Sequence, residues 1–202
     1  MNEVKIVNKL WVMFLVSILL VGCGGFRSSR NLIPVPTEEE TVLKRTKGVA
    51  MTKGNIFVVA VPLQDVKELD GFGIIIVNET PNWISVKQEE CMLVQNGKVI
   101  YPLENKRAFA RLGAGYKPKM PDLLSSDIFE WRKDVNSKNS KGSKFSDEDK
   151  KLLIVTGSRE SMYLYFSTQG NIAPMQLIIP SIYNETTKER TNFSFKFEVQ
   201  KK

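Results

Sequence analysis

The residues of this chain that could carry out chemistry are two cysteines and a few carboxylates, because its 202 residues include no histidine. Serine triads, cysteine–histidine pairs, histidine-ligated zinc and most general-base catalysis near neutral pH require an imidazole. The chain also has no Walker motif, nucleophile elbow or Ser-x-x-Lys motif, and Gly71-Phe72-Gly73 and Gly113-Ala114-Gly115 lack the rest of a dinucleotide fingerprint. We therefore expect no enzymatic activity and no cofactor or metal.

Two acidic clusters are the remaining candidates for catalysis, Asp147-Glu148-Asp149 and Glu89-Glu90. A glycosidase needs two carboxyl groups about 5 to 9.5 Å apart, and a metal would use the same oxygen ligands. The first cluster lies in a strongly charged run and the second at a junction between predicted strands. We interpret both as solvated side chains, with a hydrolase that relies on carboxylates alone as an alternative.

The first cysteine, Cys23, follows a segment typical of an export signal. Residues 1–9 carry Lys5 and Lys9 against Glu3, and the run 10–21 is apolar except for Ser17. Twelve residues are too few for the ~20 that cross a bilayer as a helix, but they match the ~7 to 15 of a signal peptide.

This run ends in Leu20-Val21-Gly22-Cys23, which resembles the lipobox of bacterial lipoproteins. The resemblance implies cleavage of signal peptide 1–22, transfer of a diacylglyceryl group to the Cys23 thiol and acylation of the new amino group. Each buried CH₂ contributes about 0.8 kcal/mol, so two or more acyl chains anchor stably where one does not. An uncleaved signal anchor is the alternative, and it also holds the domain at a membrane.

Cleavage removes two lysines and one glutamate, so the net charge falls from +7 to +6. Because this positive charge then lies outside the cytoplasm, we expect no nucleic-acid partner. The expected partners are the membrane itself, an envelope protein or an anionic envelope polymer. Gly24 replaces the aspartate that retains some lipoproteins at an inner membrane, so the resemblance implies the periplasmic face of an outer membrane if the cell has one.

Residues 23–37 are small, polar or proline without periodicity, and we interpret them as a flexible tether. A single domain is then expected over residues 38–202. Thr37 and Glu40 have the spacing of a capping box, which suggests one short helix through Leu43.

Strand patterns begin at residue 56. Runs 56–61, 73–77 and 83–86 are β-branched or aromatic, and Pro62, Asp70-Gly71 and residues 78–81 mark turns between them. Residues 91–95 and 98–101 flank Asn96-Gly97, which favours a hairpin with a type I′ turn. Cys91 has no disulfide partner once Cys23 is lipidated, and we interpret it as a buried apolar residue on a strand.

The second half continues with predicted strands 152–155, 161–166, 175–179 and 192–199. In the last of these Phe193, Phe195, Phe197 and Val199 alternate with polar residues, as in a strand with one buried face. Helices are expected over 104–112 and 121–132. Residues 133–151 hold ten charged residues among nineteen, so we expect a mobile insertion there.

About eight short strands without βαβ alternation predict a mainly β fold, an antiparallel β-sandwich, with a partly closed barrel as the alternative. Residues 56–199 resemble immunoglobulin-like accessory domains of bacterial envelope lipoproteins in Val77-Asn78, Trp83 and the Asn96-Gly97 hairpin, although the Cys-Trp-Cys signature is absent. We expect a membrane-anchored envelope lipoprotein that binds or scaffolds a partner. A carrier of a hydrophobic ligand is the second hypothesis.

Overall fold

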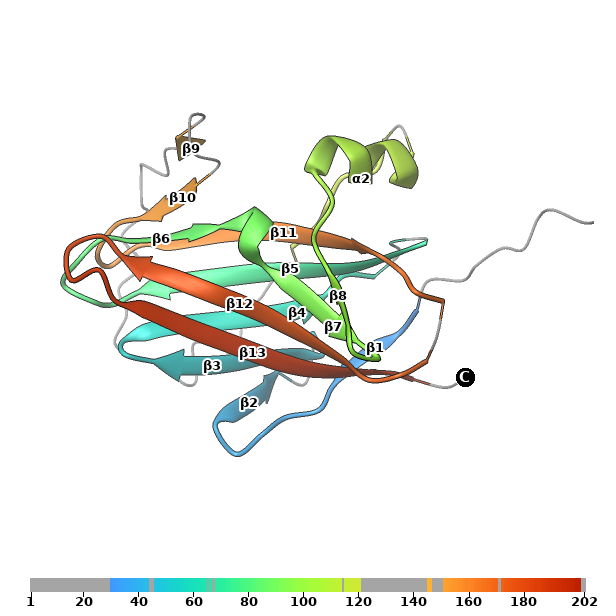
Figure 1. Ribbon diagram of the computed structural model, residues 1–202, viewed down its shortest axis with the longest axis horizontal. Helices are drawn as coiled ribbons and strands as arrows, with labels where there is room; N and C mark the ends of the chain where they lie inside the picture. The colour runs from blue at the N-terminus through green and yellow to red at the C-terminus, as the bar shows by residue number, and fades with distance from the viewer. Residues whose placement is uncertain are drawn as a thin grey trace, which may run out of the picture.

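A computed structural model describes residues 30–200 apart from 44–45, 65, 67, 114, 121–144, 147–150 and 171. Within this part of the chain, two antiparallel sheets pack face to face and are not closed into a barrel (Figure 1). The prediction of a β-sandwich is therefore confirmed, and the barrel alternative is wrong.

The larger sheet has eight strands among the described residues, in the order β1-β13-β12-β6-β10-β9, with β7 paired to β12 and β8 to β7. The strand pairings of this sheet are antiparallel throughout the described residues. The strands are β1 (Leu32–Pro34), β6 (Ile84–Lys87), β7 (Met92–Gln95), β8 (Lys98–Ile100), β9 (Phe145–Ser146), β10 (Lys151–Ile154), β12 (Met175–Asn184) and β13 (Arg190–Val199).

The smaller sheet has five strands in the described chain, in the order β11-β5-β4-β3-β2. They are β2 (Glu40–Leu43), β3 (Gly48–Lys53), β4 (Ile56–Pro62), β5 (Leu69–Asn78) and β11 (Arg159–Ser167). The first predicted helix is confirmed as α2 (Asn105–Leu112), which ends at Gly113 with a φ of 95°. None of the described helices has the length and hydropathy needed to cross a bilayer.

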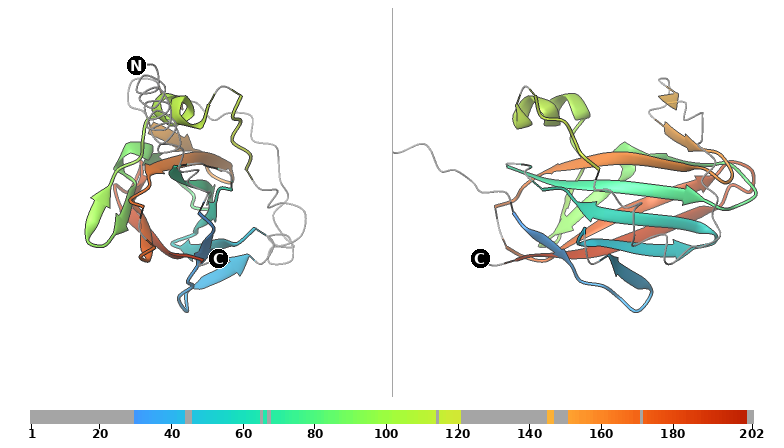
Figure 2. Two further views of the ribbon diagram at one scale, coloured as in Figure 1. Left: turned by 90° about the vertical axis from the view of Figure 1, so that its right-hand side faces the viewer. Right: turned by 180° about the vertical axis from the view of Figure 1, so that it is seen from behind.

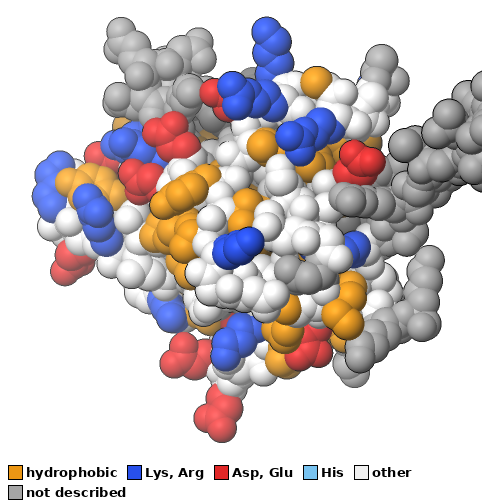
Figure 3. All heavy atoms as spheres, turned by 45° about the vertical axis from the view of Figure 1, so that its right-hand side comes forward, with side chains coloured by type: hydrophobic (Ala, Val, Ile, Leu, Met, Phe, Trp, Pro, Cys, Tyr) orange, Lys and Arg blue, Asp and Glu red, His pale blue; other side chains and the backbone are white. Residues whose placement is uncertain are grey.

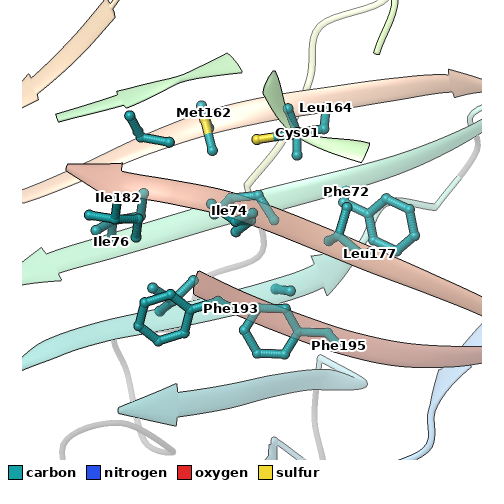
Figure 4. Close-up of a cluster of buried hydrophobic side chains, with 14 of the residues drawn as sticks. Phe72, Ile74, Ile76, Cys91, Met162, Leu164, Leu177, Ile182, Phe193 and Phe195 are labelled. Atoms are coloured by element: carbon teal, nitrogen blue, oxygen red, sulfur yellow. The ribbon is translucent and has the colours of Figure 1, made fainter. Parts of the chain in front are cut away.

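The core lies between the two sheets and follows the alternation of their strands. Phe193, Phe195 and Phe197 of β13 are fully buried, as the sequence pattern predicted. They belong to the same cluster as Ile74 and Ile76 of β5 (Figure 4). Full burial of such a side chain contributes about 1.5–3 kcal/mol, so this cluster is the main source of stability.

The outer face of the smaller sheet is also covered, since nine of the ten residues of β5 are buried. The sequence analysis placed a turn at Asp70-Gly71, but β5 runs through both residues, and the turn prediction is wrong. A Cβ at Gly71 would lie 3.2 Å from the side chains of Leu63 and Val66. Glycine is therefore used here for close packing against the sheet rather than for a turn.

The expected tether over 23–37 extends too far along the chain. Leu32 is buried, and β1 pairs with β13 in the register Leu32 to Val199, so the folded domain begins before residue 38. A three-residue strand that ends in Pro34, with Pro36 two residues later, has no detectable period, and only its pairing partner defines it. β3 was also missed by the sequence analysis.

The helix expected after Thr37 is a strand, β2. The capping contact itself forms, because the Thr37 amide donates to Glu40 Oε2 at 2.7 Å. It closes a turn in which the Glu40 amide donates to the Thr37 carbonyl at 3.1 Å. Pairing of β2 with β3 supplies the backbone hydrogen bonds that a short isolated helix could not sustain.

Several predictions fall outside the described residues, namely the signal peptide 1–22, Cys23 and the helix over 121–132. Most of the expected insertion over 133–151 lies there too, except that Phe145–Ser146 forms β9 and Lys151 begins β10.

Candidate functional site

The described chain begins at Arg30, at the end of the sandwich where β13 ends (Figure 2). Leu32 pairs with Val199, and the Gln200 amide donates to the Asn31 carbonyl at 2.9 Å. An extended chain spans at most about 3.6 Å per residue, so the seven steps from Cys23 to Arg30 cover at most ~25 Å. An anchor on Cys23 would therefore hold this end of the domain close to a bilayer.

Arg30 fastens this end to the opposite sheet through an ion pair with Asp70 of β5. Arg30 Nε donates to Asp70 Oδ1 at 3.0 Å, and a terminal nitrogen of the same guanidinium donates to the other carboxylate oxygen. The Asp70 side chain is 1% exposed. Burial raises the pKa of Asp70, and the hydrogen bonds from Arg30 and Thr168 partly oppose that rise.

The structure does not bring the predicted acidic residues together. Glu89 and Glu90 lie in the short 3₁₀ turn η1 (Gln88–Glu90), where Glu90 Oε1 is 3.8 Å from Lys87 Nζ. The Asp147-Glu148-Asp149 cluster lies outside the described residues. Over the described part of the chain, no group of three or more acidic or cysteine side chains is arranged to hold a metal ion.

Cys91 is fully buried, which confirms its interpretation as a small apolar residue, but it lies immediately before β7 rather than on a strand. It belongs to the cluster between the sheets (Figure 4). Burial, together with the nearby Glu90 carboxylate, raises the pKa of the thiol to about 12. A thiol of this kind stays protonated at neutral pH and is a poor nucleophile.

A feature that the sequence analysis missed lies at the other end of the sandwich, around Tyr183 of β12. Three cationic groups surround its ring: Lys188 Nζ at 5.6 Å, Lys151 Nζ at 5.7 Å and Arg190 Cζ at 6.0 Å from the centroid. These distances are within the range of cation–π attraction. We call Trp83, Lys151, Tyr183, Lys188 and Arg190 the basic–aromatic patch.

An irregularity in β12 creates this patch. Met175, Leu177 and Ile179 point into the core, and strict alternation would send Tyr183 to the same side. The pairing with β13 shifts register between Ile179 and Ile182, so that Ile182 is buried and Tyr183 lies on the outer face. β-Bulges that re-aim a side chain are frequent beside functional sites.

Glu185 connects Ser85 to Lys151 of the patch. Its Oε1 accepts hydrogen bonds from Ser85 Oγ at 2.5 Å and from Lys151 Nζ at 2.6 Å. Burial raises the pKa of Glu185, but the hydrogen bonds and the positive charges of Lys151 and Lys188 outweigh burial and lower it. The carboxylate is therefore ionised at neutral pH and holds Lys151 in place.

Aromatic and acidic side chains complete the surroundings. Trp83 is 53% exposed. Its carbonyl accepts a hydrogen bond from the Glu185 amide at 2.9 Å, which places Trp83 beside the turn that follows Tyr183. Basic and acidic side chains gather around hydrophobic ones at the left-hand end of the face shown in Figure 3. Lys151 is paired with Glu185. Lys188 and Arg190 are exposed, and the exposed Glu189, whose Oε2 accepts a hydrogen bond from Thr187 Oγ1, lies between them in the sequence.

Comparisons with protein-family models, with curated proteins and with solved structures find no match for this chain. The immunoglobulin-like resemblance therefore stays an interpretation of the sequence. Any function must be argued from the residues of this chain.

Proposed function

We propose that this protein is a lipid-anchored envelope module that binds or scaffolds a partner on the extracytoplasmic side of a membrane. The observation that carries the proposal is the charged start, the apolar run and Cys23 directly at its end. A β-sandwich that begins only a few residues later is a compact module well suited to presentation at a membrane surface. With Gly24 after the anchor cysteine, an outer membrane facing the periplasm is the proposed location in cells that have one.

The chemistry of the chain favours binding over catalysis. Histidine is absent from the whole sequence, the Cys91 thiol is buried with a raised pKa, and Glu90 lies near Lys87 rather than in a carboxylate pair. Buried side chains from both sheets belong to one hydrophobic cluster, which supports a binding surface over the alternative of a hydrophobic-ligand carrier. A carboxylate-dependent hydrolase is the weakest of the three.

The anchor is tested by metabolic labelling with a fatty-acid probe in cells that produce the full chain. We expect label on the wild type, no label on Cys23→Ala, and full labelling of the control Cys91→Ala, because only Cys23 belongs to a segment that resembles a lipobox. The Cys23→Ala protein should also keep the mass of the uncleaved chain. Label that persists in Cys23→Ala, or that is absent from the wild type, would contradict the proposal.

A further inference from the structure

We propose that the basic–aromatic patch binds an anionic polymer of the cell envelope, one whose sugar units carry carboxylate or phosphate groups. The inference rests on the proposed function for the orientation of the domain. The contacts, the charges and the β12 irregularity around Tyr183 support the patch itself independently of that orientation.

The cations of the patch are arranged to receive an extended anion. Lys188 and Arg190 lie within about 6 Å of one tyrosine ring, on either side of Glu189 in the sequence, and the Glu189 carboxylate accepts a hydrogen bond from Thr187 Oγ1. Lys188 Nζ donates to the Glu185 carbonyl at 2.7 Å, which fixes the position of its ammonium group. Lys87 pairs in register with Lys151 on β6 and β10, and its ammonium group lies 3.8 Å from Glu90 Oε1. Arginine and lysine in this arrangement recognise carboxylate and phosphate groups.

The aromatic groups explain why the partner should also carry a ring or other flat apolar surface. Tyr183 lies on the outer face of the sheet, and Trp83 is largely exposed beside the Glu185 backbone. Tryptophan, tyrosine and arginine are the residues most often found to dominate binding energy at interfaces. A sugar ring presents C–H groups to such a platform while its acidic substituent reaches the neighbouring cation.

The position of the patch distinguishes a polymer from lipid headgroups. β13 runs from Arg190, in the patch, to Val199, which pairs with the first strand of the domain. Nine steps at about 3.3 Å each separate these ends by ~30 Å, and they lie at opposite ends of the sandwich (Figures 1 and 2). Attraction between exposed charges is screened beyond about 8 Å at physiological salt. The patch therefore lies at the end of the sandwich opposite the proposed anchor, beyond the range of headgroup charges when the anchored end rests on the bilayer.

The test uses full-length lipidated protein in vesicles of neutral phosphatidylcholine, with polygalacturonate as the probe and neutral dextran as the uncharged comparison. Loading of the vesicles reports the anchor, and binding of polygalacturonate reports the patch, so failures of the two proposals are distinguishable. The patch variants are Lys188→Glu with Arg190→Glu, and Tyr183→Ala beside Tyr183→Phe. Lys98→Glu with Lys196→Glu is the charge-matched control, because both lysines are exposed and lie toward the other end.

We expect wild-type protein to bind polygalacturonate and not dextran, and the Lys188/Arg190 pair to weaken binding about tenfold or more. The Lys98/Lys196 pair and Tyr183→Phe should change the dissociation constant less than about twofold, with thermal midpoints checking that each variant is folded. Replacing part of the neutral lipid by phosphatidylglycerol should leave binding unchanged.

Three results would overturn the proposal. Equal losses in the two charge-reversed pairs would indicate non-specific attraction to a basic protein. Unchanged binding in folded Lys188/Arg190 and Tyr183→Ala variants would place the polymer elsewhere. Loss of polymer binding on anionic vesicles would assign the patch to lipid headgroups.

Discussion

At the scale of single residues, the same chemical group takes opposite roles according to its surroundings. Cys23 follows an apolar run at the start of the chain, where the proposed lipidation would require an accessible thiol. Cys91 is enclosed between the sheets, and its Sγ donates a weak hydrogen bond to the Lys87 carbonyl at 3.7 Å. Because burial disfavours the thiolate, this second cysteine contributes packing rather than reactivity.

A thiol-titration experiment tests this assignment. In Cys23→Ser protein only Cys91 can react, and with a pKa of about 12 roughly one thiol in ten thousand is ionised at pH 8. We expect no reaction with a thiol reagent in the folded protein and complete reaction of one thiol in denaturant. Rapid labelling under native conditions would show that Cys91 is exposed or activated.

At the scale of elements, local turn chemistry decides the hairpin of β7 and β8. Asn96 and Gly97 have φ angles of 50° and 72°, as a type I′ turn requires, and Gln95 pairs with Lys98 across it. Glycine adopts positive φ without the steric cost that a Cβ brings, and asparagine tolerates it better than most residues. This prediction from two residues is confirmed.

Substitutions in this turn should therefore differ sharply. Gly97→Val places a β-branched residue at positive φ and should lower the free energy of unfolding by about 1–2 kcal/mol or more. Asn96→Gly accepts the same backbone conformation and should be nearly neutral. Urea unfolding measures both, and equal stability of Gly97→Val and wild type would contradict the role of the turn.

At the scale of the whole molecule, a few polar contacts join the two sheets across their ends. The Asn78 side chain, on β5, donates to the carbonyl of Ile154 on β10 at 3.0 Å and is fully buried. At the opposite end, Arg30 links the start of the chain to Asp70 of β5. These contacts determine how one sheet is set against the other, whereas the hydrophobic cluster supplies the bulk of the stability.

The Arg30–Asp70 pair gives a prediction at this scale. Arg30→Ala leaves a buried carboxylate without its partner, and we expect a loss toward the lower end of about 3–5 kcal/mol, because Arg30 is partly exposed. Arg30→Met combined with Asp70→Leu removes both charges and should recover most of that loss. Urea unfolding of the wild type, Arg30→Ala and the double variant measures these free energies. An Arg30→Ala protein as stable as the wild type would show that the ion pair does not contribute to stability.

The amino-acid sequence by itself determined the features that depend on neighbouring residues. The alternation in β13, the hairpin at Asn96-Gly97, the helix ending at Gly113 and the β-sandwich class all follow from side-chain periodicity and turn conformation, which act over a few residues. The anchor signal is local in the same sense, and it remains a prediction.

Only the tertiary structure decided the features that depend on pairing between distant segments. β1 exists because β13 supplies its hydrogen bonds, and Arg30 meets Asp70 across 40 positions of sequence. The patch around Tyr183 arises because the register shift after Ile179 turns this tyrosine to the outer face, where it meets Lys151 of β10 and the cations Lys188 and Arg190 at the β12–β13 turn. The physical reason is that strand register and bulges are set by the partner strand, which no local pattern specifies.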